Sequence, residues 1–103
     1  MQTLTPQQLK EKMTSGMTLL DVRQLEEIEL ANLQGTVNIP MSELPTRLSE
    51  LNPKAPIAVI CHHGMRSEMT ARFLEKNGFA DVSNLAGGID AWSVTIDSSV
   101  PRY

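Results

Sequence analysis

One thiol stands in the segment of the chain best suited to chemistry. Cys61 follows the apolar run at residues 57–60 and begins the sequence Cys-His-His-Gly-Met-Arg, which ends at Arg66. Because a thiolate is a strong nucleophile, a cysteine at the end of a buried strand is a candidate for covalent catalysis. A cysteine taken alone is more often a packing residue, since free cysteines are among the most buried residue types. The residues around Cys61 favour the chemical interpretation.

The sequence after Cys61 predicts a short loop that leads into a helix at residues 67–76. The first turn of such a helix directs free N–H groups and the positive end of its dipole toward the cysteine. Gly64 lets the backbone turn close to the sulfur, and Arg66 adds a fixed positive charge. Backbone amides in a loop of this kind can surround an anion or a thiolate sulfur. We therefore expect Cys61 to be an activated nucleophile.

The neighbours of Cys61 are expected to form the mouth of the site. His62 and His63 can tune local charge there, and Met65 can form an apolar rim that selects an acceptor. Ser67 is expected to cap the helix, with a hydroxyl beside the sulfur as the alternative. No metal is expected on Cys61 and the two histidines, because adjacent side chains point apart. A single cysteine also excludes an internal disulfide and zinc sites built from several cysteines, and no cofactor is predicted.

Two charged residues at another strand end are assigned to structure. Asp21 and Arg23 lie at the end of the apolar segment 18–22. We expect them to form an ion pair that fixes the neighbouring loop, with Glu26 or Glu27 as the further partner of Arg23. Asp21 and Arg23 are therefore expected to support the site and not to react.

The elements that must position Cys61 follow from the hydrophobic pattern. Strands are predicted at residues 18–22, 36–39, 57–60 and 82–85, and helices at 6–15, 24–30, 42–51, 67–76 and from 89 onward. On the helix at 67–76, Met69, Phe73 and Leu74 are expected to face the core. Strands that alternate with helices predict an α/β fold, with a central, mostly parallel sheet and helices on both faces. Ligands bind such sheets beyond the carboxyl ends of the strands, where Cys61 is placed.

Length and composition limit the class of protein. The chain has 103 residues, so we expect residues 1–103 to form a single domain. The net charge is −3 at pH 7, so nucleic acid is not an expected partner. The longest apolar run is too short to span a bilayer, and residues 1–10 lack the pattern of a signal peptide. We therefore expect a cytoplasmic protein that does not bind membranes.

Four motifs together resemble the rhodanese-like sulfurtransferase family over nearly the whole chain. They are LLDVR at 19–23 followed by Glu26 and Glu27, GTVNIP at 35–40, the loop CHHGMR at 61–66, and NLAGGIDAW at 84–92. Two positions depart from the family pattern. Ala31-Asn32 stand where Gly-His is usual, and Thr36 stands where Ala is frequent. Both departures lie away from the cysteine loop, so they affect local packing and not the expected chemistry.

The resemblance implies sulfur transfer by a single rhodanese-like domain. The Cys61 thiolate would attack the outer sulfur of a small donor such as thiosulfate and become a persulfide. A thiophilic acceptor, such as cyanide or a small or protein thiol, would then remove that sulfur. The residues expected to contact the substrate are His62, His63, Gly64, Met65, Arg66 and Ser67. Because the chain has only one thiol, an outside acceptor must complete turnover.

Two other functions are compatible with the sequence. Phosphatases and arsenate reductases that share this fold also use a Cys thiolate, but five residues separate their Cys and Arg, whereas four separate Cys61 and Arg66. If the loop is treated as a ring of Cα steps, the shorter loop has a radius smaller by about 0.6 Å. That size suits one sulfur atom better than a tetrahedral oxyanion. The third function is a non-catalytic sulfur carrier or binding module, although binding modules of this family usually lack the cysteine.

Overall fold

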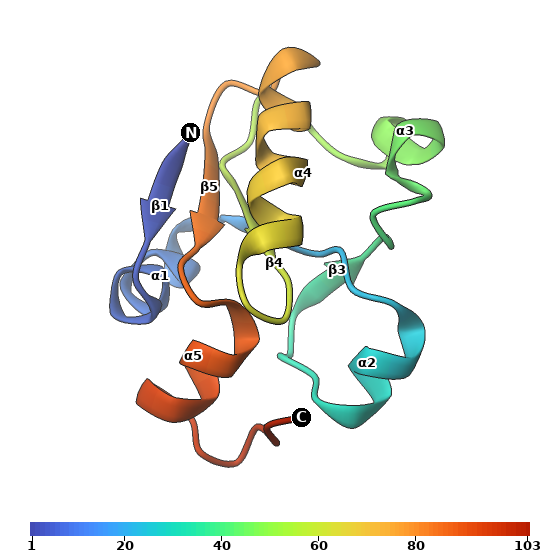
Figure 1. Cartoon of the computed structure of the whole chain (residues 1–103). Coiled ribbons are helices and arrows are strands. Elements are labelled where there is room, and N and C mark those ends of the chain that lie inside the picture. Colours follow the sequence, from blue (N-terminus) through green and yellow to red (C-terminus); the bar gives the residue numbers. More distant parts are fainter.

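Five parallel strands form the centre of the computed structural model, which describes residues 1–103 (Figure 1). The strands are β1 (Gln2–Leu4), β2 (Thr18–Asp21), β3 (Thr36–Asn38), β4 (Ile57–Ile60) and β5 (Val82–Leu85). Their order across the sheet is β1-β5-β4-β2-β3, and every neighbouring pair is parallel. The strand that precedes Cys61 therefore lies in the middle of the sheet, as its unbroken apolar run predicts.

Helices connect these strands in the predicted alternation. They are α1 (Pro6–Lys12), α2 (Leu25–Leu30), α3 (Leu44–Arg47), α4 (Met65–Lys76) and α5 (Gly88–Thr95), with 3-10 turns at Met13–Ser15 and Leu48–Glu50. Strand β1 was not predicted, because three residues at the edge of a sheet are too few to show a period. The longest helix, α4, has 12 residues, and none of the helices is both long and apolar enough to cross a bilayer.

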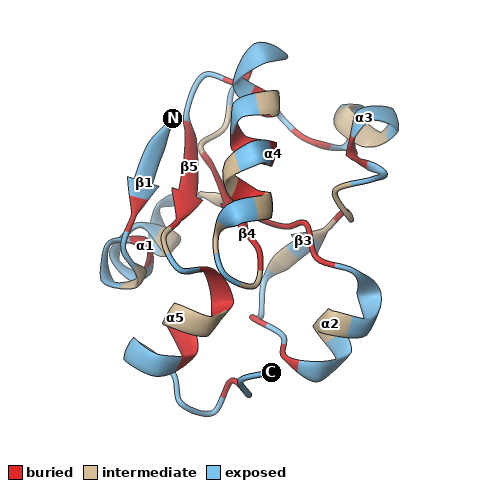
Figure 2. Cartoon of the chain, viewed as in Figure 1, coloured by how far each residue is buried: buried red, intermediate tan, exposed pale blue.

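Alternate residues of the strands pack against helices on opposite faces of the sheet. In β4, Ile57 and Val59 belong to the core beneath α3 and α4, whereas Ala58 and Ile60 belong to the core beneath α1 and α5. Figure 2 shows the buried residues concentrated on β4 and β5. The predicted α/β class with helices on both faces is thus confirmed. Cys61 continues the alternation and faces the α4 side.

Of the three residues of α4 predicted to face the core, Leu74 is buried there and Phe73 packs against it, whereas the prediction for Met69 was wrong. The helix buries Ser67, Thr70, Ala71 and Leu74, whereas Met69 is 60% exposed. Met69 therefore lies toward solvent, and Phe73 is only partly buried. The polar residues Ser67 and Thr70 face the core in their place. Hydrophobic spacing alone cannot identify small polar residues that face the core.

The structure contains the expected ion pair between Asp21 and Arg23, and both side chains are fully buried. The Nη2 atom of Arg23 lies 2.7 Å from Asp21 Oδ2 and donates a second bond to the carbonyl oxygen of Ala31 at 2.7 Å. The expected carboxylate partner from α2 was wrong, because Arg23 contacts only the backbone oxygen of Glu27. The pair thus ties the end of β2 to the middle and the C-terminal end of α2.

The first turn of α5 holds the backbone around Cys61. The N–H of Ile89 donates to the Cys61 carbonyl at 2.8 Å, and the N–H of Asp90 donates to the His62 carbonyl at 3.2 Å. Gly88 makes this approach possible, because a Cβ at that position would lie 2.4 Å from the Cys61 oxygen and 2.5 Å from the His62 oxygen. With these carbonyls turned toward α5, the N–H groups of the loop are free to face the sulfur.

Replacing Asp21 by Asn tests the buried pair. The substitution removes the charge that Arg23 faces and keeps the size of the side chain. Since the guanidinium stays buried, we expect the free energy of unfolding to fall by about 3 kcal/mol or more, as measured by urea unfolding. Asp81→Asn is the control, because Asp81 is exposed, and there we expect a change within about 0.5 kcal/mol. Equal stability of the two variants would contradict this account.

Gly88→Ala and Gly78→Ala compare two glycines that both have positive φ, 63° and 90°. Each alanine costs about 1–2 kcal/mol in the left-handed conformation. A Cβ at Gly78 meets nothing within 4 Å, whereas at Gly88 it overlaps the loop carbonyls. We expect Gly88→Ala alone to displace the loop and raise the rate of Cys61 alkylation by iodoacetamide several-fold. Equal alkylation rates in both variants would refute the role of Gly88.

Candidate active site

The sulfur of Cys61 lies at the carboxyl end of β4, inside the loop that joins this strand to α4. The residue is only 1% exposed. The N–H of Gly64 donates to Sγ at 3.0 Å, and the N–H groups of His63, Met65 and Arg66 have no protein acceptor. These N–H groups are therefore available to a sulfur atom or an anion bound at Cys61.

The φ angle of Gly64 is 104°, a backbone conformation that favours glycine. A Cβ there would lie 3.2 Å from the backbone nitrogen of Gly87. Gly64 also occupies the N-cap position of α4, so the helix begins at Met65, two residues earlier than predicted. The short loop is compact because glycines meet at this point, and this is what brings the Gly64 N–H onto the sulfur.

Ser67 lies beside the sulfur and does not cap the helix. The predicted capping role was wrong, because the early start of α4 places Ser67 inside the first turn. The Cys61 thiol donates to Ser67 Oγ at 3.3 Å, and the Ser67 hydroxyl contacts Oδ1 of Asn84. The Asn84 amide donates to the Gly64 carbonyl at 3.2 Å. The alternative role of Ser67, a hydroxyl next to the thiol, is the arrangement present.

Asn84 is a site residue that the analysis of the sequence missed. It lies on β5, is 6% exposed, and connects the Ser67 hydroxyl to the loop through the bonds just described. Buried polar side chains are expected to be hydrogen-bonded, so a polar residue inside an otherwise buried strand is a usable signal. That signal could be used only if β5 were known to be fully buried. The sequence of residues 82–85 did not reveal this, because Ser83 and Asn84 are polar.

Arg66 points away from the sulfur and toward α2. Its two terminal nitrogens lie 2.6 and 2.8 Å from the two carboxylate oxygens of Glu27, which is a bidentate ion pair. This contact with Arg66 lowers the pKa of Glu27 to about 2, so the pair is fully ionised at neutral pH. Glu27 is one of the two residues predicted to pair with Arg23. Its carboxylate pairs with Arg66 instead.

Tyr103 joins the loop to α2 and to the buried arginine. Its hydroxyl donates to Glu27 Oε2 at 2.8 Å and accepts from Arg23 Nη1 at 2.9 Å. Its ring stacks on the His62 imidazole with a centroid distance of 3.8 Å and an angle of 8°. In Figure 1 the C-terminal segment accordingly ends between α5 and α2. No local pattern in the sequence predicted this position.

The two histidines of the loop differ in environment. Burial, followed by the charge of His63, lowers the pKa of His62, so its imidazole is neutral at neutral pH. His63 is 63% exposed, and its Nδ1 lies 4.0 Å from Asp90, which is itself bound to Arg102 at 2.8 Å. No three histidine, cysteine or acidic side chains converge in a way that could hold a metal ion.

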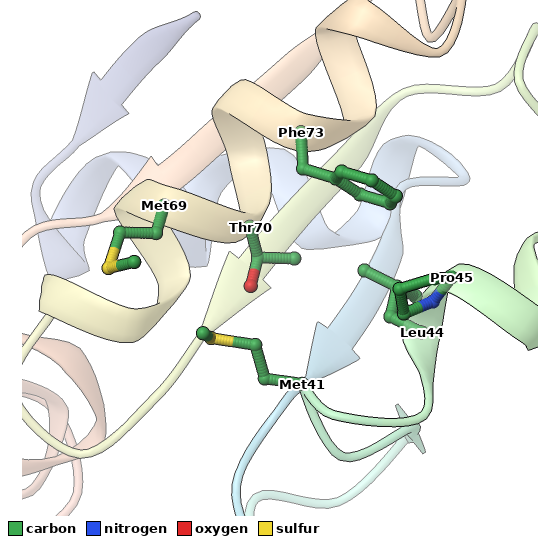
Figure 3. A pocket seen from close by; sticks show the side chains of 6 residues that line it. All are labelled: Met41, Leu44, Pro45, Met69, Thr70 and Phe73. Carbon is green, nitrogen blue, oxygen red and sulfur yellow. The ribbon is translucent and has the colours of Figure 1, made fainter.

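Apolar side chains continue from the mouth of the site along α4. Met65, the first residue of the helix, is 77% exposed. Beyond it lies a groove of about 240 Å³ (Figure 3), lined by Met41, Leu44, Pro45, Met69, Thr70 and Phe73. The groove is on the same side of the sheet as Cys61, and the buried Thr70 hydroxyl in its wall has no partner. The surface next to the loop is therefore apolar on its α4 side.

The arrangement is suited to covalent chemistry on one sulfur atom. A thiol, a hydroxyl and a backbone N–H are in contact, and further N–H groups of the same loop have no protein acceptor. Preorganised N–H donors of this kind stabilise negative charge that develops during a reaction. No general base is in contact with the thiol, so the site depends on the thiolate itself as the nucleophile.

Comparison with known proteins identifies relatives of this site and fold. The model of the family described as Rhodanese-like domain matches residues 5–95. YrkF of Bacillus subtilis, whose name describes it as a candidate sulfur carrier protein, is 44% identical over 86 residues. That match covers 82% of this chain but only 46% of YrkF, so the chain spans less than half of this relative's length. Thiosulfate sulfurtransferase GlpE of Ectopseudomonas mendocina is 30% identical, with 96% of this chain and 91% of GlpE covered.

Solved structures show the same fold. A rhodanese-related protein from Thermoplasma volcanium has a TM-score of 0.84 and 32% identity, and the match covers 98% of this chain and 96% of that one. The CoADR-RHD protein of Bacillus anthracis has a TM-score of 0.89 and 29% identity, with 96% of this chain and 18% of that protein covered. Sequence, fold and loop thus agree, and the chain belongs to the rhodanese-like domain family.

Proposed function

We propose that this protein is a sulfurtransferase that moves a sulfane sulfur from a small donor to an outside thiophilic acceptor through a persulfide on Cys61. One observation carries the proposal. The Cys61 sulfur contacts the Gly64 N–H and the Ser67 hydroxyl, inside a loop whose other N–H groups have no acceptor. These N–H groups could donate hydrogen bonds to a second sulfur bound to Cys61 and stabilise its negative charge.

The proposed reaction has two displacement steps. In the first, the Cys61 thiolate attacks the outer sulfur of a donor such as thiosulfate, a new S–S bond forms, and sulfite leaves with the electron pair of the broken S–S bond. In the second, an acceptor such as cyanide or a thiol attacks the outer sulfur of the persulfide and releases the Cys61 thiolate. The chain has no second cysteine, so the acceptor comes from outside.

Phosphatase or arsenate reductase activity is a weaker proposal. In those reactions the arginine of the loop must hold a tetrahedral oxyanion, and here Arg66 is occupied by Glu27. The four-residue spacing between Cys61 and Arg66 adds to this argument. A non-catalytic binding module is disfavoured by the presence of the cysteine and its N–H donors. A free, single thiol also suits a reducing compartment, so we propose a cytoplasmic location.

Mass spectrometry of the protein after exposure to a sulfur donor tests the proposal. We expect the peptide that contains Cys61 to gain about 32 Da, the mass of one sulfur atom, and to lose it again when cyanide is added. Cys61→Ser is the control, because its hydroxyl is a far weaker nucleophile at neutral pH, and it should gain no sulfur. Absence of the adduct in the wild-type protein, together with release of phosphate from an aryl phosphate, would overturn the proposal in favour of a phosphatase.

A further inference from the structure

The cations around the loop are all neutralised by carboxylates. Three arginines lie at this edge of the sheet, and each is bound to one acidic side chain. The pairs are Arg23–Asp21, Arg66–Glu27 and Arg102–Asp90. Residues 22–24, 61–67 and 86–90, which surround the sulfur, contain no lysine. The formal charge of this set of six residues is therefore zero, and no arginine is left to bind an anionic donor.

In the pair formed by the loop arginine, Arg66–Glu27, the carboxylate accepts hydrogen bonds from other groups as well as from Arg66. Both carboxylate oxygens of Glu27 bind Arg66, and in addition Oε2 accepts from the Tyr103 hydroxyl while Oε1 accepts from the N–H of Gln24. Only 20% of the Glu27 side chain is exposed. A dianion that needs the Arg66 guanidinium must displace a carboxylate with four donors, which makes the exchange costly.

His62 and Met65 add no fixed charge to the mouth. His62 lies beneath the Tyr103 ring as a neutral imidazole, as described above. On the other side, Met65 exposes an apolar side chain. A donor that carries two negative charges would lose solvation on entering this mouth and would gain no unpaired cation in return. A donor whose sulfane sulfur carries at most one negative charge loses less solvation on entering the mouth.

We propose that Glu27, held in place by Tyr103, is a specificity-determining residue that selects an organic hydropersulfide, R–S–SH, whose sulfane sulfur carries at most one negative charge, over a dianionic donor such as thiosulfate. This inference rests on the proposed persulfide chemistry of Cys61 and names its donor class. Glu27 acts by occupying Arg66, and it does not touch the reacting sulfur. Glu27 thus acts through Arg66, and its effect on the rate of sulfur transfer must depend on the charge of the donor.

The first step with this donor is balanced without any further reactant. The Cys61 thiolate attacks the terminal sulfur of R–S–SH, and the new bond joins that sulfur to Cys61. The S–S bond of the donor breaks, and its electron pair leaves with R–S⁻, which takes a proton from water. The products are the Cys61 hydropersulfide and a free thiol, R–SH, and no net oxidation or reduction occurs.

The experiment compares two donors on variants that differ by one charge. The second-order rate constant for adding sulfur to Cys61 is measured with thiosulfate and with cysteine hydropersulfide at low salt. In Glu27→Gln, which keeps the bond from the Gln24 N–H, we expect the thiosulfate rate constant to rise at least tenfold and the hydropersulfide rate constant to stay within twofold. The thiosulfate gain should shrink as salt is added, because it arises from a freed cation.

Glu26→Gln is the matched control, because Glu26 is the exposed neighbour of Glu27 on α2 and makes the same change in net charge. It should leave both rate constants within twofold of wild type. Tyr103→Phe is a second variant that keeps the ring on His62 and removes one donor from Glu27. We expect a smaller gain with thiosulfate alone, which keeps the test decisive if Glu27→Gln folds poorly.

Three results would overturn the inference and leave the proposed function intact. These are equal gains with the two donors, equal gains in Glu26→Gln and Glu27→Gln, or no gain with thiosulfate in folded Glu27→Gln and Tyr103→Phe. Absence of a Cys61 adduct from either donor in the wild-type protein would instead refute the proposed sulfur transfer itself.

Discussion

The buried guanidinium of Arg23 is the contact on which the arrangement of the site depends. It neutralises Asp21 at the end of β2, binds carbonyl oxygens in the middle and at the C-terminal end of α2, and donates to Tyr103. A buried charge must be paired and hydrogen-bonded, so the surrounding chain is held where these partners are needed. Arg23 holds α2 in place, and α2 carries Glu27. The position of Arg23 therefore also fixes the position of the carboxylate that pairs with Arg66. A purely structural ion pair thus helps to set the charge around the Cys61 loop.

The loop itself is stabilised from the other side by α5. Its first N–H groups bind the carbonyls of Cys61 and His62, which leaves the loop N–H groups free for the sulfur. Gly64 and Gly88 are required by close contact and positive φ, and both belong to the motifs that resemble the family. Backbone N–H groups, and not a titratable base, therefore form the environment of the thiol.

The charge balance at the mouth is set by residues that lie far apart in the sequence. A single arginine in a loop of this kind looks, in the sequence, like a ready anion site. In the structure its charge is already used by an acidic residue 39 positions away. The exposed Met65 and the apolar groove along α4 offer a different surface for recognition.

The sequence by itself determined the α/β alternation, the central place of β4 and the position of Cys61 at its end. The capping box of Thr5 and Gln8 and the left-handed Gly16 at the end of the first helical segment are equally local. These features depend on residues close together in the chain, where spacing and backbone preference are visible. Only the tertiary structure decided the strand β1, the contact of Ser67 with Asn84, and the cluster of Arg66, Glu27 and Tyr103. Those contacts join residues 17 to 76 positions apart, and side-chain hydrogen bonds over such separations leave no periodic pattern that the sequence could reveal.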